Sequence, residues 1–168
     1  PELAKLAERG ADAAASPLMF PRPMLSQLEK SGDLDFSFSG LKTAVVLACR
    51  QQELSGQIDD QTRADIAAEF QRATVEVLVK KSMAALSANR LNTLVVAGGV
   101  GANRALRDAF DHAASHGGFR VFYPEMALCT DNGAMIAFAA ALRMRARPSG
   151  QGYTFSVRPR WDLAEGRA

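Results

Sequence analysis

The chain has 168 residues, of which 48% are hydrophobic, and its net charge is +2 at pH 7. This balance excludes a disordered chain and predicts one domain or one lobe of a larger protein. No apolar run reaches the roughly 20 residues that a membrane span needs, and the first residues lack the layout of a signal peptide. The two cysteines, Cys49 and Cys129, are too few for a disulfide framework, so we expect packed thiols in a reduced, cytoplasmic protein.

The first part of the sequence predicts a short helix followed by an irregular segment. PELAKLAERG favours a helix that ends at Gly10, and it opens as though within a longer protein. Residues 11–38 include three prolines in SPLMFPRPM and are therefore expected to be irregular. Within them, Leu34, Phe36 and Phe38 alternate with polar residues, which would suit a short strand.

Two longer helices follow. Ser39 is a candidate N-cap for a helix through LKTAVVLACRQQEL, with Leu41, Val45 and Cys49 on one stripe. Asp59 and Asp60 begin a second helix, whose apolar pattern continues toward Leu86 and is long enough that a break is possible. The apolar stripe of this second helix consists of Ile66, Phe70, Ala73 and Val77.

The hydrophobic period then changes. TLVVAG and RVFYP predict two short strands, and the first is apolar enough to be buried on both faces. ANRALRDAFDHAASHG and DNGAMIAFAAALRMRA predict the helices that follow them. The predicted fold class is therefore α/β, mostly helical with a short parallel β-α-β unit, and further strands of the sheet are expected outside this chain. The basic end, RMRARPSGQGYTFSVRPRW, is either a nucleic-acid contact or a solvated tail.

A glycine-rich turn joins the first predicted strand to its helix. Gly98, Gly99 and Gly101 occur within four residues, and Asn103 follows in the first turn of the helix. Ligands of open α/β sheets bind at the carboxyl ends of the strands, and glycines there let the backbone approach a base or a phosphate. An Asn side chain adds a donor and an acceptor for a ribose hydroxyl or a carbonyl. The alternative is a helix start whose glycines only permit close packing.

Asp131 follows the second predicted strand and is expected near the same crevice as Asn103. On spacing alone, Thr130 or Asp131 is the N-cap of the last helix, or Asp131 is a metal-binding carboxylate. His112 and His116 have metal-ligand spacing, but they lie at the far end of their helix, where a surface position is favoured.

Four separated motifs carry a resemblance to a known family: DFSFSGLKTAV, LVVAGGVGANRALR, VFYPEMALCTDNGAMIA and FSVRPRWDL. Together they resemble the C-terminal half of the TsaD (Gcp) family, once described as O-sialoglycoprotein endopeptidase. The resemblance implies one C-terminal lobe, residues 1–168, of an actin/Hsp70-like (ASKHA, RNase H-like) ATPase fold. It also implies transfer of a threonylcarbamoyl group from threonylcarbamoyl-AMP to adenosine 37 of tRNAs that read ANN codons.

The resemblance further implies a divalent metal ion, iron or zinc, and an adenylate or ATP-type nucleotide. Asn103 matches the family's adenylate contact, Gly98 and Gly99 match the loop near the base, and Asp131 matches a metal ligand. The implied partners are tRNA, a paralogous dimerisation subunit and a small ATPase, with Arg22, Lys42 and the terminal arginines as candidate phosphate contacts.

The family's His-x-x-x-His metal ligands and its phosphate loop are not matched in this sequence, and no general base is evident. We therefore expect no transfer by this chain alone, and an apolar exposed face that causes association or poor solubility. Two alternatives stay open: a metallopeptidase, following the older description, and a non-catalytic interaction subunit.

Overall fold

The computed structural model describes residues 2–11, 18–56, 58–130 and 132–146. The chain forms two compact units, residues 1–131 and residues 132–168. The first unit contains α1 (Glu2–Ala7), α2 (Leu25–Ser31), α3 (Ser39–Ser55), α4 (Asp60–Ala88), β1 (Thr93–Val95), the 3-10 turn η1 (Gly99–Ala102), α5 (Arg104–Gly117), β2 (Arg120–Phe122) and the 3-10 turn η2 (Met126–Leu128). The second unit contains α6 (Gly133–Ala146).

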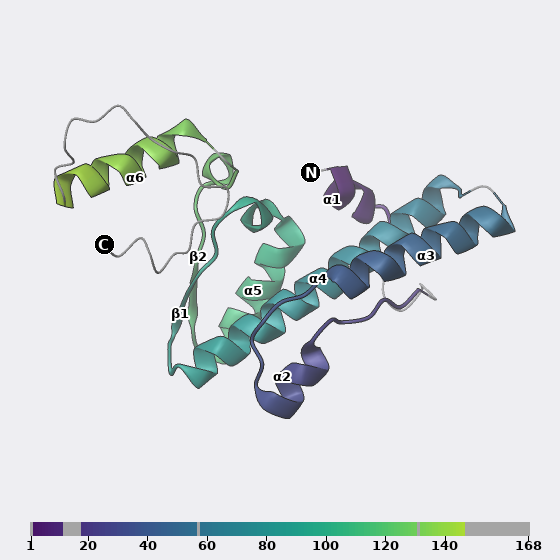
Figure 1. Ribbon diagram of the computed structural model, residues 1–168, viewed down its shortest axis with the longest axis horizontal. Helices are drawn as coiled ribbons and strands as arrows, with labels where there is room; N and C mark the ends of the chain where they lie inside the picture. The colour runs from purple at the N-terminus through teal and green to yellow at the C-terminus, as the bar shows by residue number, and fades with distance from the viewer. Residues whose placement is uncertain (1, 12–17, 57, 131, 147–168) are drawn as a thin grey trace. The chain divides into compact units, whose positions relative to one another are not determined.

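Helix α4 is the central element of the first unit. Its 29 residues run without the break that the sequence allowed, over about 43 Å at 1.5 Å per residue. The helices α1, α2, α3 and α5 and the strand β1 all contact it (Figure 1). The helix begins at Asp60, in agreement with the expected start at Asp59 and Asp60, and Asp59 is its N-cap, accepting a hydrogen bond from the Thr62 N–H at 2.7 Å. All the other described α-helices of this unit therefore pack against α4.

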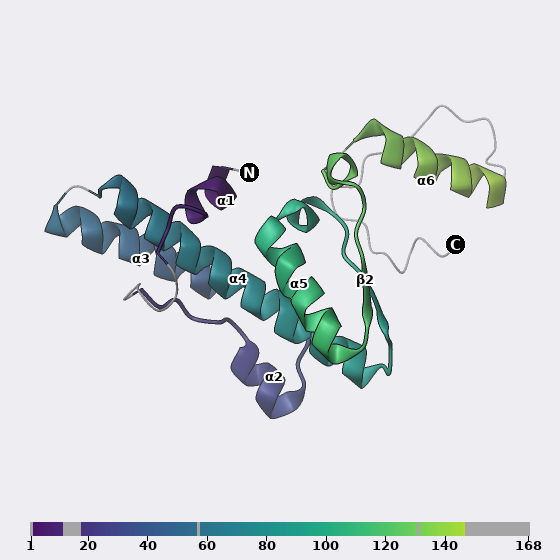
Figure 2. The same cartoon turned by 180° about the vertical axis from the view of Figure 1, so that it is seen from behind.

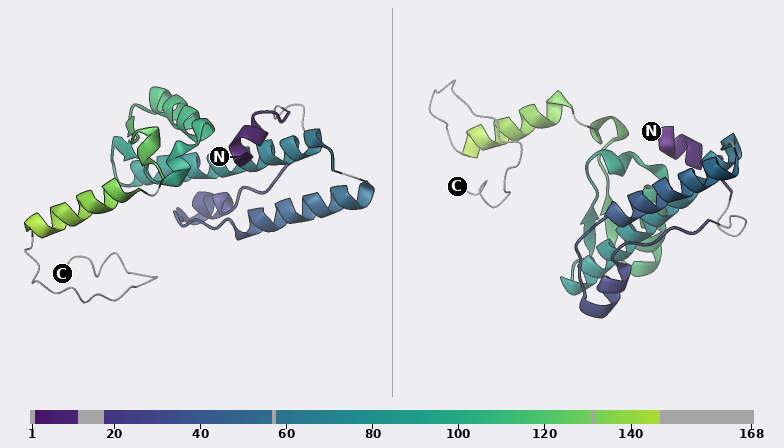
Figure 3. Two further views of the ribbon diagram at one scale, coloured as in Figure 1. Left: turned by 90° about the horizontal axis from the view of Figure 1, so that it is seen from above. Right: turned by 45° about the vertical axis from the view of Figure 1, so that its right-hand side comes forward.

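The predicted apolar stripes form the core between α3 and α4, which lie side by side in Figure 3. Leu41, Ile66 and Ala73 are buried together with Phe20. Val45, Cys49 and Phe70 pack against this cluster from partly buried positions. Both helix stripes are therefore confirmed, and the segment that carries Phe20 completes the core.

Three details of this half of the chain differ from expectation. Residues 25–31 were expected to be irregular but form the helix α2. The sequence signals that indicate this helix are Pro23 shortly before it and Gly32, with φ +70°, at its end. The N-cap position of α3 is Phe38, not Ser39, whose hydroxyl instead pairs with the Ser37 hydroxyl at 3.1 Å.

The third difference is that residues 34–38 form no strand. Instead, the buried ammonium of Lys81, on α4, donates hydrogen bonds to the backbone carbonyls of Asp33, at 3.0 Å, and Asp35. It also lies over the Phe36 ring, 5.6 Å from the centroid. Carbonyls that turn toward one cation are not available to a strand ladder, so the hydrophobic alternation there does not produce a strand.

The β-α-β unit is present as predicted. Strands β1 and β2 are parallel, with Leu94 opposite Val121 and Val95 opposite Phe122. Helix α5 lies between α4 and the strands (Figure 2). The expectation that the first strand is buried on both faces is wrong for the described residues, because Val95 of β1 is 68% exposed, and Phe122 beside it on β2 is 51% exposed. Leu94 and Val121 are half-buried, whereas the open face carries Val95 and Phe122 together with the exposed, charged Arg120, so it is not the uniformly apolar face that we expected.

Helix α6 of the second unit begins at Gly133, and none of its residues is buried. The Asn132 side chain accepts a hydrogen bond from the Met135 N–H at 2.9 Å, so Asn132 performs the capping role that the sequence assigned to Thr130 or Asp131. No helix among the described residues has the length and hydrophobicity needed to cross a membrane.

Candidate nucleotide-binding site

The glycine-rich turn stands at the carboxyl end of β1, where the sequence placed it. Gly98 has φ +84° and ψ 178°, a conformation that is essentially restricted to glycine. A Cβ atom built on Gly98 or Gly99 meets no atom within 4 Å. At Gly101, a Cβ atom would be in ordinary contact with the Val96 carbonyl oxygen, at 3.5 Å. The turn thus combines a glycine-only backbone at Gly98 with open space at Gly98 and Gly99.

Asn103 is the N-cap of α5, one residue before the helix starts, and not within its first turn. Its Oδ1 accepts a hydrogen bond from the Leu106 N–H at 2.9 Å, and its Nδ2 donates to Gln71 Oε1 at 2.9 Å. A carboxamide has two N–H donors and two acceptor lone pairs, so these contacts use one of the two donors and one of the two lone pairs. The other donor and lone pair remain for a ligand, in an orientation that the two protein contacts fix.

Gln71 is a site residue that sequence reasoning missed. It lies on α4, 32 positions before Asn103, and no spacing rule connects the two. The only sequence signal is its place on α4, one residue after Phe70 of the core stripe. An exposed-looking Gln next to a core residue has no distinctive pattern, so only the tertiary structure identifies it.

The second strand–turn junction lies at the same end of the parallel strands (Figure 1). Tyr123, Pro124 and Glu125 lead from β2 into η2, and Cys129 follows with only 2% of its surface exposed. The Cys129 thiol faces the Glu125 carbonyl oxygen at 3.5 Å, which confirms a packed thiol. Asp131 itself lies outside the described residues, so its expected place beside Asn103 stays a prediction.

The two histidines lie on the surface, as predicted. His116 Nδ1 is 2.8 Å from the backbone oxygen of His112, and both side chains are exposed at the end of α5. Among the described residues, no group of three His, Cys, Asp or Glu side chains is placed to hold a metal ion. The described residues therefore do not fit a metal ion by themselves.

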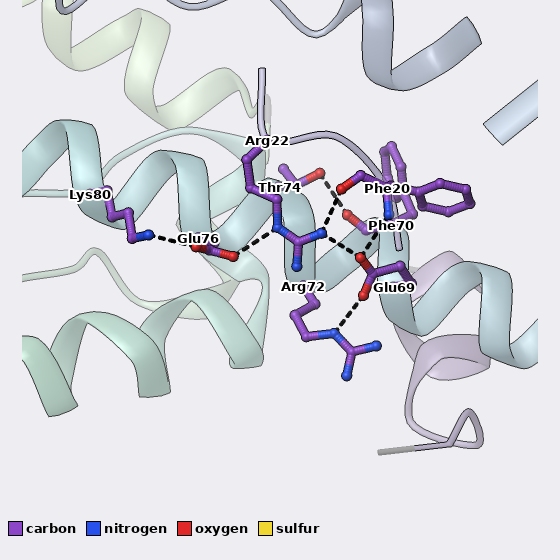
Figure 4. A network of polar contacts seen from close by, with 8 residues as sticks. All are labelled: Phe20, Arg22, Glu69, Phe70, Arg72, Thr74, Glu76 and Lys80. Carbon is purple, nitrogen blue, oxygen red and sulfur yellow. Dashed lines mark hydrogen bonds and ion pairs between the residues drawn. The ribbon is translucent and has the colours of Figure 1, made fainter. Parts of the chain in front are cut away.

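Arg22, a candidate tRNA contact, has its charge neutralised within the protein (Figure 4). Its guanidinium pairs with the Glu69 carboxylate and, at 2.8 Å through Nε, with Glu76. Glu69 also accepts from Arg72 Nε at 2.7 Å and from the Phe20 N–H at 2.9 Å. This arrangement favours a structural role for Arg22 over phosphate binding.

Lys42, another candidate tRNA contact, is exposed. Together with Arg63, it lines a concavity of about 620 Å³ between α1, α3 and α4. The remaining lining is almost entirely apolar and includes Leu6, Val45 and Ile66. The structure thus leaves Lys42 accessible, at the side of an apolar cleft.

Comparison with known proteins shows the family of this chain. Residues 1–138 match the TsaD family, described as tRNA N6-adenosine threonylcarbamoyltransferase. This chain belongs to the TsaD family. It is 55% identical to the tRNA N6-adenosine threonylcarbamoyltransferase of Burkholderia mallei and 56% identical to that of Chromobacterium violaceum. Each comparison covers 98% of this chain but only 47% and 46% of the relative, so the chain spans about half the length of these TsaD proteins.

Proposed function

We propose that this chain provides part of the active site of a tRNA N6-adenosine threonylcarbamoyltransferase, within the C-terminal lobe of an ASKHA-type fold. The substrates would be threonylcarbamoyl-AMP and adenosine 37 of ANN-decoding tRNA. The partners would be a paralogous dimerisation subunit and a small ATPase. Family membership supports the reaction class, and the chain's coverage of about half of its relatives supports an incomplete site.

The observation that carries the proposal is the pair formed by the open glycine turn and Asn103. Gly98 and Gly99 leave space beside the backbone, and Asn103 presents one unused donor and one unused lone pair at the same helix start. Helix N-termini also favour negatively charged groups. This combination suits the AMP half of the substrate, held with its adenine or ribose against the turn.

The role of these residues is to place the reacting carbon, because none of them supplies a base. In the transfer, the N6 amine attacks the carbamoyl carbonyl carbon and forms a C–N bond. The bond from that carbon to the phosphate oxygen breaks, AMP leaves with the electron pair, and the amine loses one proton. Correct placement can lower such a barrier substantially, which makes binding of the AMP half a catalytic contribution.

A metal site remains a separate part of the proposal. Asn132 already caps α6, so the helix does not need the Asp131 carboxylate as its cap. We therefore assign Asp131 as one ligand of an iron or zinc ion whose other ligands would lie in the half of the relatives that this chain does not span. When bound, such an ion would polarise the carbonyl or phosphate oxygens of the adenylate.

A chimaera tests the proposal directly. This chain would replace the matching part of the Chromobacterium violaceum relative, and transfer to unmodified tRNA would be measured with partner proteins and threonylcarbamoyl-AMP. We expect product from the chimaera, at least tenfold less from Asn103→Ala, and none from the 168-residue chain alone.

Two further variants complete the assay: the first is a control, and the second tests the proposed metal ligand. Asn89→Ala changes an exposed Asn at the end of α4 and should leave transfer unchanged. Asp131→Ala should lose both product and bound metal, measured by elemental analysis. A well-folded chimaera that binds tRNA but gives no product would instead indicate a non-catalytic interaction subunit, and undiminished product from Asn103→Ala would exclude the nucleotide role of Asn103.

A further inference from the structure

The two turns at the carboxyl ends of β1 and β2 are joined by very little regular structure. The ladder pairs only three residues of each strand. Its last hydrogen bond toward the turns runs from the Val96 N–H to the Phe122 carbonyl at 2.9 Å. Beyond that point the backbones separate into η1 and η2, so any fixed geometry between the turns needs a further connection.

Arg107 of α5 provides such a connection. Its Nε donates to the Gly101 carbonyl at 2.6 Å, on the glycine-rich turn. Its Nη2 donates to the Pro124 carbonyl at 3.0 Å and to the Cys129 thiol at 3.3 Å, at the start and end of the second junction. One planar guanidinium thus bonds both turns at once, through different nitrogens.

Tyr123 fixes the position of Arg107 in return. The Arg107 guanidinium carbon lies 4.7 Å from the centre of the Tyr123 ring, within cation–π range. The Tyr123 hydroxyl lies 3.1 Å from the Arg107 carbonyl oxygen and 2.9 Å from Asp111 Oδ1, and can donate to either. Burial and the Asp111 carboxylate raise the pKa of Tyr123, so this hydroxyl remains a donor at neutral pH.

We propose that Arg107 is a positioning residue that ties the glycine-rich turn, residues 98–102, to the segment 124–129, so that the two sides of the site keep one relative geometry. The link itself exists without any ligand, and only its consequence for nucleotide binding rests on the proposed function. A nucleotide that orders the glycine-rich turn would then also order the second junction, which it need not touch.

Lysine is the informative replacement, because it keeps the charge and most of the length. Its single ammonium cannot hold Gly101 and Pro124 through separate, fixed nitrogens. Arg107→Lys should therefore fold while the link fails. Arg107→Met removes the link and the charge together. The matched controls are Arg50→Lys and Arg50→Met, at an exposed arginine of α3.

The first readout is amide hydrogen exchange of the chimaera without ligand, followed by mass spectrometry. We expect exchange on the order of tenfold faster in both segments 98–102 and 124–129 of Arg107→Lys, with no change in α4. The Arg50 variants should match the parent. Faster exchange in only one segment, in neither, or throughout the first unit would overturn the link, since Arg107 would then serve one turn alone or stability in general.

The second readout adds AMP as the probe. In the parent, AMP should slow exchange in both segments. In Arg107→Lys it should protect the glycine-rich turn alone, with a Kd on the order of tenfold higher. Equal protection of both segments in Arg107→Lys would contradict the inference. Failure of the parent to bind AMP would count against the proposed function, while the ligand-free comparison would still decide the role of Arg107.

Discussion

The buried carboxylate of Glu69 offers a quantitative test of what holds residues 18–22 on α4. Its side chain is only 3% exposed and accepts hydrogen bonds from Arg22, Arg72 and the Phe20 N–H. Replacement by glutamine keeps the shape and one oxygen but loses the charge and one accepting oxygen. Hydrogen bonds to charged groups contribute roughly 1.5–3 kcal/mol each, so Glu69→Gln should lower the free energy of unfolding by about 2 kcal/mol.

Urea denaturation followed by circular dichroism measures this loss, and thermal unfolding should show a midpoint about 4–8 °C lower. The control is Glu53→Gln, at an exposed position of α3, which should stay within about 0.5 kcal/mol of the parent. Equal stability of Glu69→Gln and the parent at neutral pH would refute the reasoning, because the buried ion pairs would then contribute nothing net.

The pH dependence provides a second check on the same residue. Burial raises the pKa of the Glu69 carboxyl, but the Phe20 N–H, Arg22 and Arg72 more than offset this and hold it below its ordinary value of 4.5. A lowered folded-state pKa means that the stabilisation is complete above the unfolded pKa and is lost as pH falls through the folded value. The difference between parent and Glu69→Gln should therefore persist down to about pH 5 and shrink below about 4.5. A difference that stays constant on acidification would show that the charge is not its source.

Three further predictions concern packing and the glycine-rich turn. Gly10→Ala should lower the free energy of unfolding by about 1–3 kcal/mol, because the new methyl would lie 2.6 Å from Ala68 Cβ. Gly40→Ala, whose methyl would meet nothing within 4 Å, should not destabilise α3, and urea denaturation compares the two variants. Leu41→Ala should lower the free energy of unfolding by about 2–5 kcal/mol, whereas Leu54→Ala, at a residue that is 90% exposed, should lower it by less than about 0.5 kcal/mol. Equal losses in the two variants would contradict the assigned core. Gly98→Ala should lower both stability, by about 1–3 kcal/mol, and AMP affinity, while Gly99→Ala should lower affinity alone; calorimetry with AMP separates the two effects.

The sequence predicted the elements whose signals are local and periodic. The stripes of α3 and α4 follow the helical repeat, the start of α4 follows the preference of Asp for helix N-termini, and the parallel pair β1–β2 follows the strand–helix–strand order. The position of the glycine-rich turn between β1 and α5 was also predictable, because clustered glycines after an apolar run mark the end of a strand, although Asn103 caps α5 and does not lie within its first turn.

The sequence did not predict contacts between residues that are distant in the chain. Gln71 reaches Asn103 across 32 positions, and Lys81 turns residues 33–36 away from a strand across 46 to 48 positions. The exposure of Val95 and Phe122 is likewise invisible locally, since an apolar strand looks the same whether one face or both faces are covered. These outcomes depend on which surfaces meet, and periodicity does not contain that information.

The central place of α4 has a consequence for how the protein is made. Three of the helices that pack on α4, α1 to α3, are synthesised before it, and β1 and α5 come after it. A growing chain therefore emerges from the ribosome with Phe20 and Leu41 uncovered until residues 60–88 have followed. Translation pausing before the whole of α4 has left the ribosome should prolong that exposure and increase capture by chaperones, whereas a pause after α4 has emerged should not.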